Sequence, residues 1–135
     1  MIFALALLTA ALLFGGMVLY SFGFAAFLVT ALPAETAGPT IRRAFPHFYL
    51  FVTGASTAGA LLLWPRDPLG AGLLAAVALT TQSTRQILMP AINRATDTGA
   101  QTRFKWLHGA SVLITLGHIA LASWVLVRFL AVGAA

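Results

Sequence analysis

The chain has 135 residues, of which 60% are hydrophobic and 8% are charged, and it contains no cysteine. Soluble domains carry about 25% charged residues, so this chain has too little polar surface to cover a water-exposed globule. The composition excludes a soluble enzyme, a disordered tail and a disulfide-stapled secreted module, and it indicates an integral membrane protein.

The first predicted element is a membrane span over residues 3–32. Residues 1–34 carry no charged side chain, and about 20 apolar residues suffice to cross about 30 Å of hydrocarbon. The stretch is too long for a signal peptide and has neither the basic start nor the cleavage motif of one. We therefore interpret it as an uncleaved span. Leu32-Pro33 ends it, because proline disfavours helix in the residue before it, and residues 34–44 are predicted to form a polar connection.

Three more charge-poor stretches follow, each of helix length. Two prolines mark a tight turn after the second stretch, and Pro90 is predicted to close the third, so that residues 91–103 form the longest loop. The predicted spans are 45–64, 69–89 and 104–130. The sequence therefore predicts an all-α, polytopic membrane protein. It is expected to form one domain, residues 1–135, as an antiparallel bundle of four transmembrane helices.

Basic residues predict the orientation of this bundle. Only Arg66 and Arg128 lie at the end that holds the chain termini, whereas the other end holds Arg42, Arg43, Arg94, Arg103 and Lys105. Positive residues favour the cytoplasmic side. We therefore expect a multi-pass protein of the inner membrane with both termini on the outer, periplasmic side. The net charge of +5 then reflects topology and attraction to anionic lipids. It does not indicate nucleic-acid binding, because the basic residues are scattered singly.

Small and polar residues recur at spacings of three and four along each predicted helix. Those on the fourth helix fall within about 80° of one another, and they are His108, Ser111, Thr115, His118 and Ala122. The matching faces of the first three helices are Gly16, Tyr20, Gly23 and Phe27; His47, Phe51, Gly54, Ala58 and Leu61; and Ala75, Ala78, Gln82, Arg85 and Met89. We expect these faces to meet, with Gly16 and Gly54 at helix contacts and Leu63 facing lipid.

A polar cluster is predicted near the cytoplasmic end, from Arg85, Gln82, His108 and Ser111, with Arg103 beside it. Arg85 lies roughly 7 Å and His108 about 6 Å inside the same boundary. No carboxylate lies within a predicted span. Arg85 therefore needs a helix-end carbonyl, a loop carboxylate (Asp97 or Glu35) or an external anion such as a lipid phosphate. The alternative is that Arg85 snorkels to the interface and that the histidines are ordinary interfacial residues.

Several motifs carry a family resemblance over nearly the whole chain. They are Phe14-Gly15-Gly16-Met17, Phe27-x4-Leu32-Pro33, Phe45-Pro46-x2-Tyr49, Pro90-x2-Asn93 and Phe104-x2-Leu107-His108-Gly109-x-Ser111. Together they resemble the transmembrane-protein-205-like family of small four-helix membrane proteins. That family often has Asn where this chain has Thr115. Because its activity is not established, the resemblance implies architecture more than function.

A more distant resemblance is to copper-resistance-D-like proteins and to the four-helix protoporphyrinogen oxidases of bacteria. Trp106-Leu107-His108 followed by His118 is similar to a helix of the oxidase group, which is associated with haem. This chain has Ala110 and Ser111 where that group has a lysine, so the resemblance does not extend to oxidase activity.

Three classes of function remain open. The first is a non-enzymatic accessory subunit or small transport or assembly factor, working with other membrane-protein subunits or with its own copies. The second binds haem b or copper. Haem would use His108 or His118 as axial ligand, with Arg85 on a propionate, whereas copper would use His47, Met89 and His108. The third binds an anion or lipid headgroup through Arg85, Gln82, His108 and Arg103. No complete catalytic constellation is present, so the sequence favours a protein that is not an enzyme.

Overall fold

The computed structural model describes residues 1–133, and this part of the chain forms four long helical segments and no strand. The all-α prediction is therefore confirmed. The first segment consists of α1 (Ile2–Val18), the π-helical η1 (Leu19–Phe24) and α2 (Ala25–Ala31), and the second is α3 (Ala34–Leu63). The third consists of α4 (Pro68–Ser83), the π-helical η2 (Thr84–Leu88) and α5 (Met89–Asp97), and the fourth is α6 (Gln101–Gly133).

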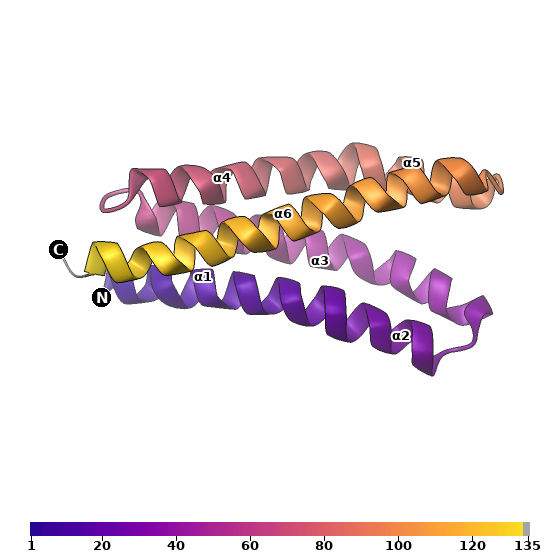
Figure 1. The fold of residues 1–135 in the computed structure, drawn as a ribbon, viewed down its shortest axis with the longest axis horizontal. Coiled ribbons are helices and arrows are strands. Elements are labelled where there is room, and N and C mark those ends of the chain that lie inside the picture. The colour runs from indigo at the N-terminus through magenta and orange to yellow at the C-terminus, as the bar shows by residue number, and fades with distance from the viewer. Residues whose placement is uncertain (134–135) are drawn as a thin grey trace.

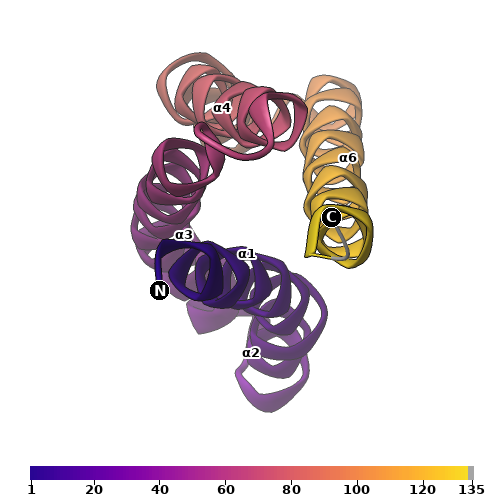
Figure 2. The ribbon, with the colours of Figure 1, turned by 90° about the vertical axis from the view of Figure 1, so that its left-hand side faces the viewer.

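The four segments run side by side in alternating directions (Figure 1). Because α1 and α4 each pack against both α3 and α6, the segments form a ring in which α3 and α6 occupy opposite corners (Figure 2). The N-terminus, the C-terminal end of α6 and the turn before α4 lie at one end, and the two other turns lie at the opposite end.

The two ends of the bundle differ in shape. We call the half with the chain termini the terminal half (residues 1–17, 50–79 and 119–133) and the other the splayed half (residues 18–49 and 80–118). In the splayed half α2 diverges from α5 and α6 (Figure 1). α1 packs against both α3 and α6, whereas α2 packs against α3. The helices are therefore held together mainly in the terminal half.

Two predicted loops are helical instead. The prediction that residues 34–44 form a connection is wrong, because α3 begins at Ala34. Only Leu32 and Pro33 interrupt the helix, and Glu35 in the first turn suits the positive end of the helix dipole. The prediction that Pro90 ends the third helix is also wrong: it lies in the first turn of α5. The wider turn of η2 before it accommodates a residue that donates no N–H.

The turn before α6 is short as a result. The helix of α5 continues to Asp97, and Gly99 adopts a left-handed conformation with φ of 67°. Glycine adopts this conformation without a steric penalty, which is why it commonly follows a helix end.

The predicted contact faces are correct for α1 and α6 at some positions, whereas on α3 only Phe51 of the predicted face packs against the core. Gly16 lies against the Phe51 ring, where an added Cβ would come within 2.6 Å of it, whereas Gly54 has nothing within 4 Å. Leu63, predicted to face lipid, is only 1% exposed. The buried face of α3 is Phe48, Tyr49, Val52, Ser56, Gly59 and Leu63. Small residues occupy two faces of this helix, so their spacing could not show which one its neighbours would cover.

The terminal half contains most of the packed core. Leu13, Leu74 and Val77 are fully enclosed there, beside Ala122 and Val125 of α6. At Gly59 a Cβ would lie 2.7 Å from the Leu74 side chain, so the glycine lets this side chain of α4 pack directly against α3.

Candidate functional site

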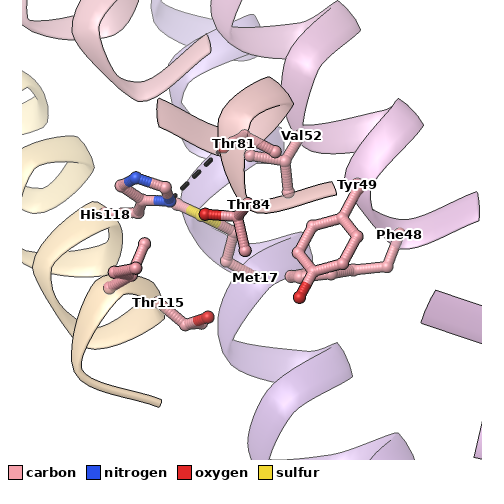
Figure 3. Close-up of a pocket in the computed structure, with 9 residues that line it drawn as sticks. Met17, Phe48, Tyr49, Val52, Thr81, Thr84, Thr115 and His118 are labelled. Atoms are coloured by element: carbon pink, nitrogen blue, oxygen red, sulfur yellow. Dashed lines mark hydrogen bonds between the residues drawn. The ribbon is translucent and has the colours of Figure 1, made fainter. Parts of the chain in front are cut away.

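A small cavity lies on the axis of the bundle, where the terminal half meets the splayed half. All four helical segments contribute to its wall, and the lining residues are Met17, Phe48, Tyr49, Val52, Thr81, Thr84, Ile114, Thr115 and His118 (Figure 3). Its volume is about 10 Å³, which is room for one water molecule. Four hydroxyl groups and one imidazole are among the groups that line it.

His118 is the histidine at this site, and it is buried, with 8% of its surface exposed. Its Nε2 lies 2.7 Å from the Thr80 hydroxyl, and its Nδ1 lies 3.4 Å from the Thr81 hydroxyl. The Thr80 hydroxyl donates to the Ala76 carbonyl at 2.7 Å, so its oxygen accepts from Nε2–H. Nδ1 is then the acceptor for Thr81. The arrangement is satisfied by a neutral ring with its proton on Nε2.

These hydrogen bonds join α4 to α6. The sequence correctly predicted that His118 faces a neighbouring helix, but it did not predict the pair of threonines, because Thr80 and Thr81 lie outside the predicted face of that helix. The signal in the sequence is a pair of adjacent threonines on one predicted helix, whose two hydroxyls can both reach a histidine on the neighbouring helix.

The residues of the predicted cytoplasmic cluster all lie in the splayed half. Gln82, Arg85 and Ser111 are partly buried, whereas Arg103 and His108 are exposed. The Ser111 hydroxyl donates to the His108 carbonyl at 2.8 Å, and the His108 ring stacks on Phe104 of its own helix. The π-helical segment η2, which carries Arg85, contacts α6. However, no hydrogen bond or ion pair among residues 1–133 joins Arg85 or Gln82 to the cluster residues on α6. Their clustering stays a prediction.

The predicted cofactor ligands come from different helices. His47 on α3 and His108 on α6 are both exposed and lie on opposite corners of the ring, and Met89 is partly buried in α5. Within residues 1–133 no three His, Asp or Glu side chains gather into a metal-binding group. His118 faces a cavity of about 10 Å³, which has no room for a porphyrin.

Two bidentate ion pairs join segments that are far apart in the sequence. Asp67 accepts from Arg128 Nε at 2.9 Å and from Nη2 at 2.6 Å, and it also accepts from the Gly70 N–H at 3.0 Å as the N-cap of α4. At the opposite end, Arg42 donates to Asp97 at 2.6 and 2.9 Å. Asp97 was one predicted partner of Arg85, and it pairs with Arg42 instead.

Sequence comparison places the chain in a family. Residues 8–101 match the family model described as "Domain of unknown function (DUF4149)". No curated protein and no solved structure matches the chain. The finer resemblance to transmembrane-protein-205-like or copper-resistance-D-like proteins is not shown by these matches. Because the matched residues make up more than half of the 135-residue chain, the protein belongs to the DUF4149 family, a family of unknown function.

Proposed function

We propose that the protein is a small integral membrane protein whose four helical segments all cross the bilayer. In this proposal it acts as an accessory subunit or as a small transport or assembly factor, and it is not an enzyme. The observation that carries the proposal is the apolar outer surface of the bundle, which a water-soluble bundle would cover with polar side chains.

Apolar side chains cover the outside of the bundle. The segments Ile2–Ala31 and Gln101–Gly133 are long and apolar enough to span a membrane, and only 22% and 17% of their most apolar windows are buried. A core helix of a soluble protein would bury most of such a window. Large apolar side chains are exposed on all four segments, among them Leu12, Phe27, Leu50, Leu61, Leu79, Ile87, Leu113 and Leu130. An apolar surface of this extent requires an apolar solvent.

A few polar side chains lie inside the bundle, beside its apolar core. Ser56, Thr81, Thr84 and His118 are all buried, and each has a hydrogen-bond partner. Internal pairing of polar side chains supports residence in a bilayer, because hydrocarbon offers them no partner.

The two central segments are long enough to cross as well. Residues 44–63 of α3 and residues 68–84 of the third segment carry no charged side chain, and α3 alone has 30 residues. Transmembrane helices use roughly 17–25 predominantly apolar residues, and the charge-free stretch of the third segment is at the short end of this range. The basic residues of the splayed half then favour the cytoplasmic side of an inner membrane, with both termini on the periplasmic side.

Cysteine labelling tests both the crossings and the orientation. The chain has no native cysteine, and Pro65 and Thr98 are exposed residues in turns at opposite ends. With a membrane-impermeant maleimide, P65C should react in cells whose outer membrane is permeable, whereas T98C should react only after the inner membrane is disrupted. If T98C reacts in intact cells, or if the protein fractionates without the membrane, the proposal is wrong.

A further inference from the structure

The hydroxyl groups around the central cavity form an incomplete hydrogen-bond network. The Thr84 hydroxyl donates to the Thr80 carbonyl at 2.8 Å, and the Thr115 hydroxyl donates to the Ser111 carbonyl at 3.0 Å. A hydroxyl has one hydrogen and two lone pairs. Both oxygens can therefore only accept any further hydrogen bond from the cavity.

Tyr49 brings the complementary group to the same cavity. It is 5% exposed, and its ring is held in place by Phe45 and Phe48 at centroid distances of 5.8 and 5.7 Å. Its hydroxyl points into the open space toward Thr115 (Figure 3). It makes no hydrogen bond among residues 1–133 and stays accessible, unlike the Tyr20 hydroxyl and Thr53 Oγ1, which are fully enclosed without a partner. The hydroxyl of a tyrosine whose ring is buried normally finds a partner, and a cavity that a water molecule can enter supplies one.

We propose that this cavity is a binding site for one ordered water molecule. The water accepts a hydrogen bond from the Tyr49 hydroxyl and donates its two hydrogens to Thr84 and Thr115. Its size matches the volume of about 10 Å³. This inference does not depend on the proposed function, because it rests only on the groups around the cavity.

Other occupants do not match the wall. An apolar molecule would leave the Tyr49 donor unmet. A cation would need carboxylate or carbonyl ligands, and the nearest side chains are hydroxyls, His118, Met17 and apolar groups. A larger polar solute does not fit the volume. A water molecule satisfies one donor and two acceptors at once.

The water would link three of the four helical segments at one height. Tyr49 lies on α3, Thr84 on η2 and Thr115 on α6, and His118 joins α4 to α6 one turn from Thr115. The site would therefore hold the segments together where the apolar core of the terminal half ends and the helices begin to diverge.

Thermal unfolding of the full chain in detergent tests the bridge through a double-mutant cycle. Tyr49→Phe and Thr115→Val each remove one hydroxyl and keep the shape of the side chain. Each should lower the melting temperature by roughly 3 °C, and the double variant should fall no further than the larger single effect, because either change already breaks the bridge. Thr115→Ser should recover most of the loss.

Thr30→Val is the matched control, because the exposed Thr30 hydroxyl also donates to a carbonyl of its own helix, at 3.0 Å from Ala26, and it lies far from the cavity. Its effect should be smaller and should add to that of Tyr49→Phe. Additive losses for Tyr49→Phe and Thr115→Val would overturn the bridge. A high-resolution experimental structure gives a second reading: density for a single water between the three hydroxyls supports the site, and an empty or differently occupied cavity contradicts it.

Discussion

In the terminal half, all four helical segments contact their neighbours through a buried apolar core. In the splayed half α2 diverges from α6, and the contacts between helices involve aromatic and polar side chains, some of them exposed. Gly59 lets the Leu74 side chain of α4 pack directly against α3 in the first region. Tyr20, Phe45 and Phe48 form the main cluster in the second, with Tyr20 stacked on Phe48 at 4.4 Å. Both π-helical turns also lie in the splayed half. Close packing therefore holds one half, and local polar and aromatic contacts hold the other.

The two ion pairs show the same contrast. Both are bidentate, but the Asp67 side chain is 4% exposed, whereas the Arg42 and Asp97 side chains are 44% and 56% exposed. Asp67 is also the N-cap of α4, so it orders a helix start and the C-terminal part of α6 at once. An exposed pair pays for ordering two flexible side chains and is screened by salt.

The largest expected effect separates the two faces of α3. Gly59→Leu should lower the free energy of unfolding by at least roughly 1–3 kcal/mol, because the new side chain would overlap Leu74. Gly54→Leu on the same helix is the control and should have little effect, because nothing lies within 4 Å of its Cβ position. Thermal melts of both variants in detergent would measure this. Equal tolerance at the two positions would mean that the core of the terminal half is not closely packed.

A smaller effect should appear at acid pH through Asp67. The Arg128 guanidinium, helped by the Gly70 N–H, holds the pKa of the Asp67 carboxyl below its ordinary value of 3.8. Its stabilising contribution is therefore complete above about pH 3.8 and is lost as the pH falls through the lower folded-state value. Asp67→Asn should keep the helix cap and remove this pH dependence, and Asp67→Ala should cost roughly 1 kcal/mol more through the lost cap. Unchanged acid sensitivity in Asp67→Asn would rule out this origin.

The smallest effect is expected at the splayed end. The Arg42 side chain also lowers the pKa of the Asp97 carboxyl, so the sign of the pH dependence is the same. Because both side chains are exposed, Asp97→Asn should shift the melting temperature less than Asp67→Asn does, and 0.5 M salt should abolish the difference from the wild type. A larger drop in melting temperature for Asp97→Asn than for Asp67→Asn would mean that the ion pair of the splayed half is the stronger of the two.

Part of this structure was accessible from local sequence features. Charge-free stretches marked four helical segments, Leu32-Pro33 marked the first break, and the spacing of His118 and Ala122 showed the buried face of α6. These features are local, because helix periodicity and proline geometry act within a few residues. The same reasoning failed at Pro39 and Pro90, where the helices continue through or around a proline. Tertiary packing and a π-helical turn outweighed the local cost there.

The sequence by itself determined that the chain is helical, apolar on its outer surfaces and divided into four segments, because composition and periodicity are properties of each segment alone. Only the tertiary structure decided which face of α3 is buried, which arginine pairs with which aspartate, and which hydroxyls surround the cavity. Arg128 and Asp67 are 61 residues apart, and His118 and Thr80 are 38 apart. Such pairs depend on the rotation and register of whole helices against one another, and no short stretch of sequence encodes these quantities.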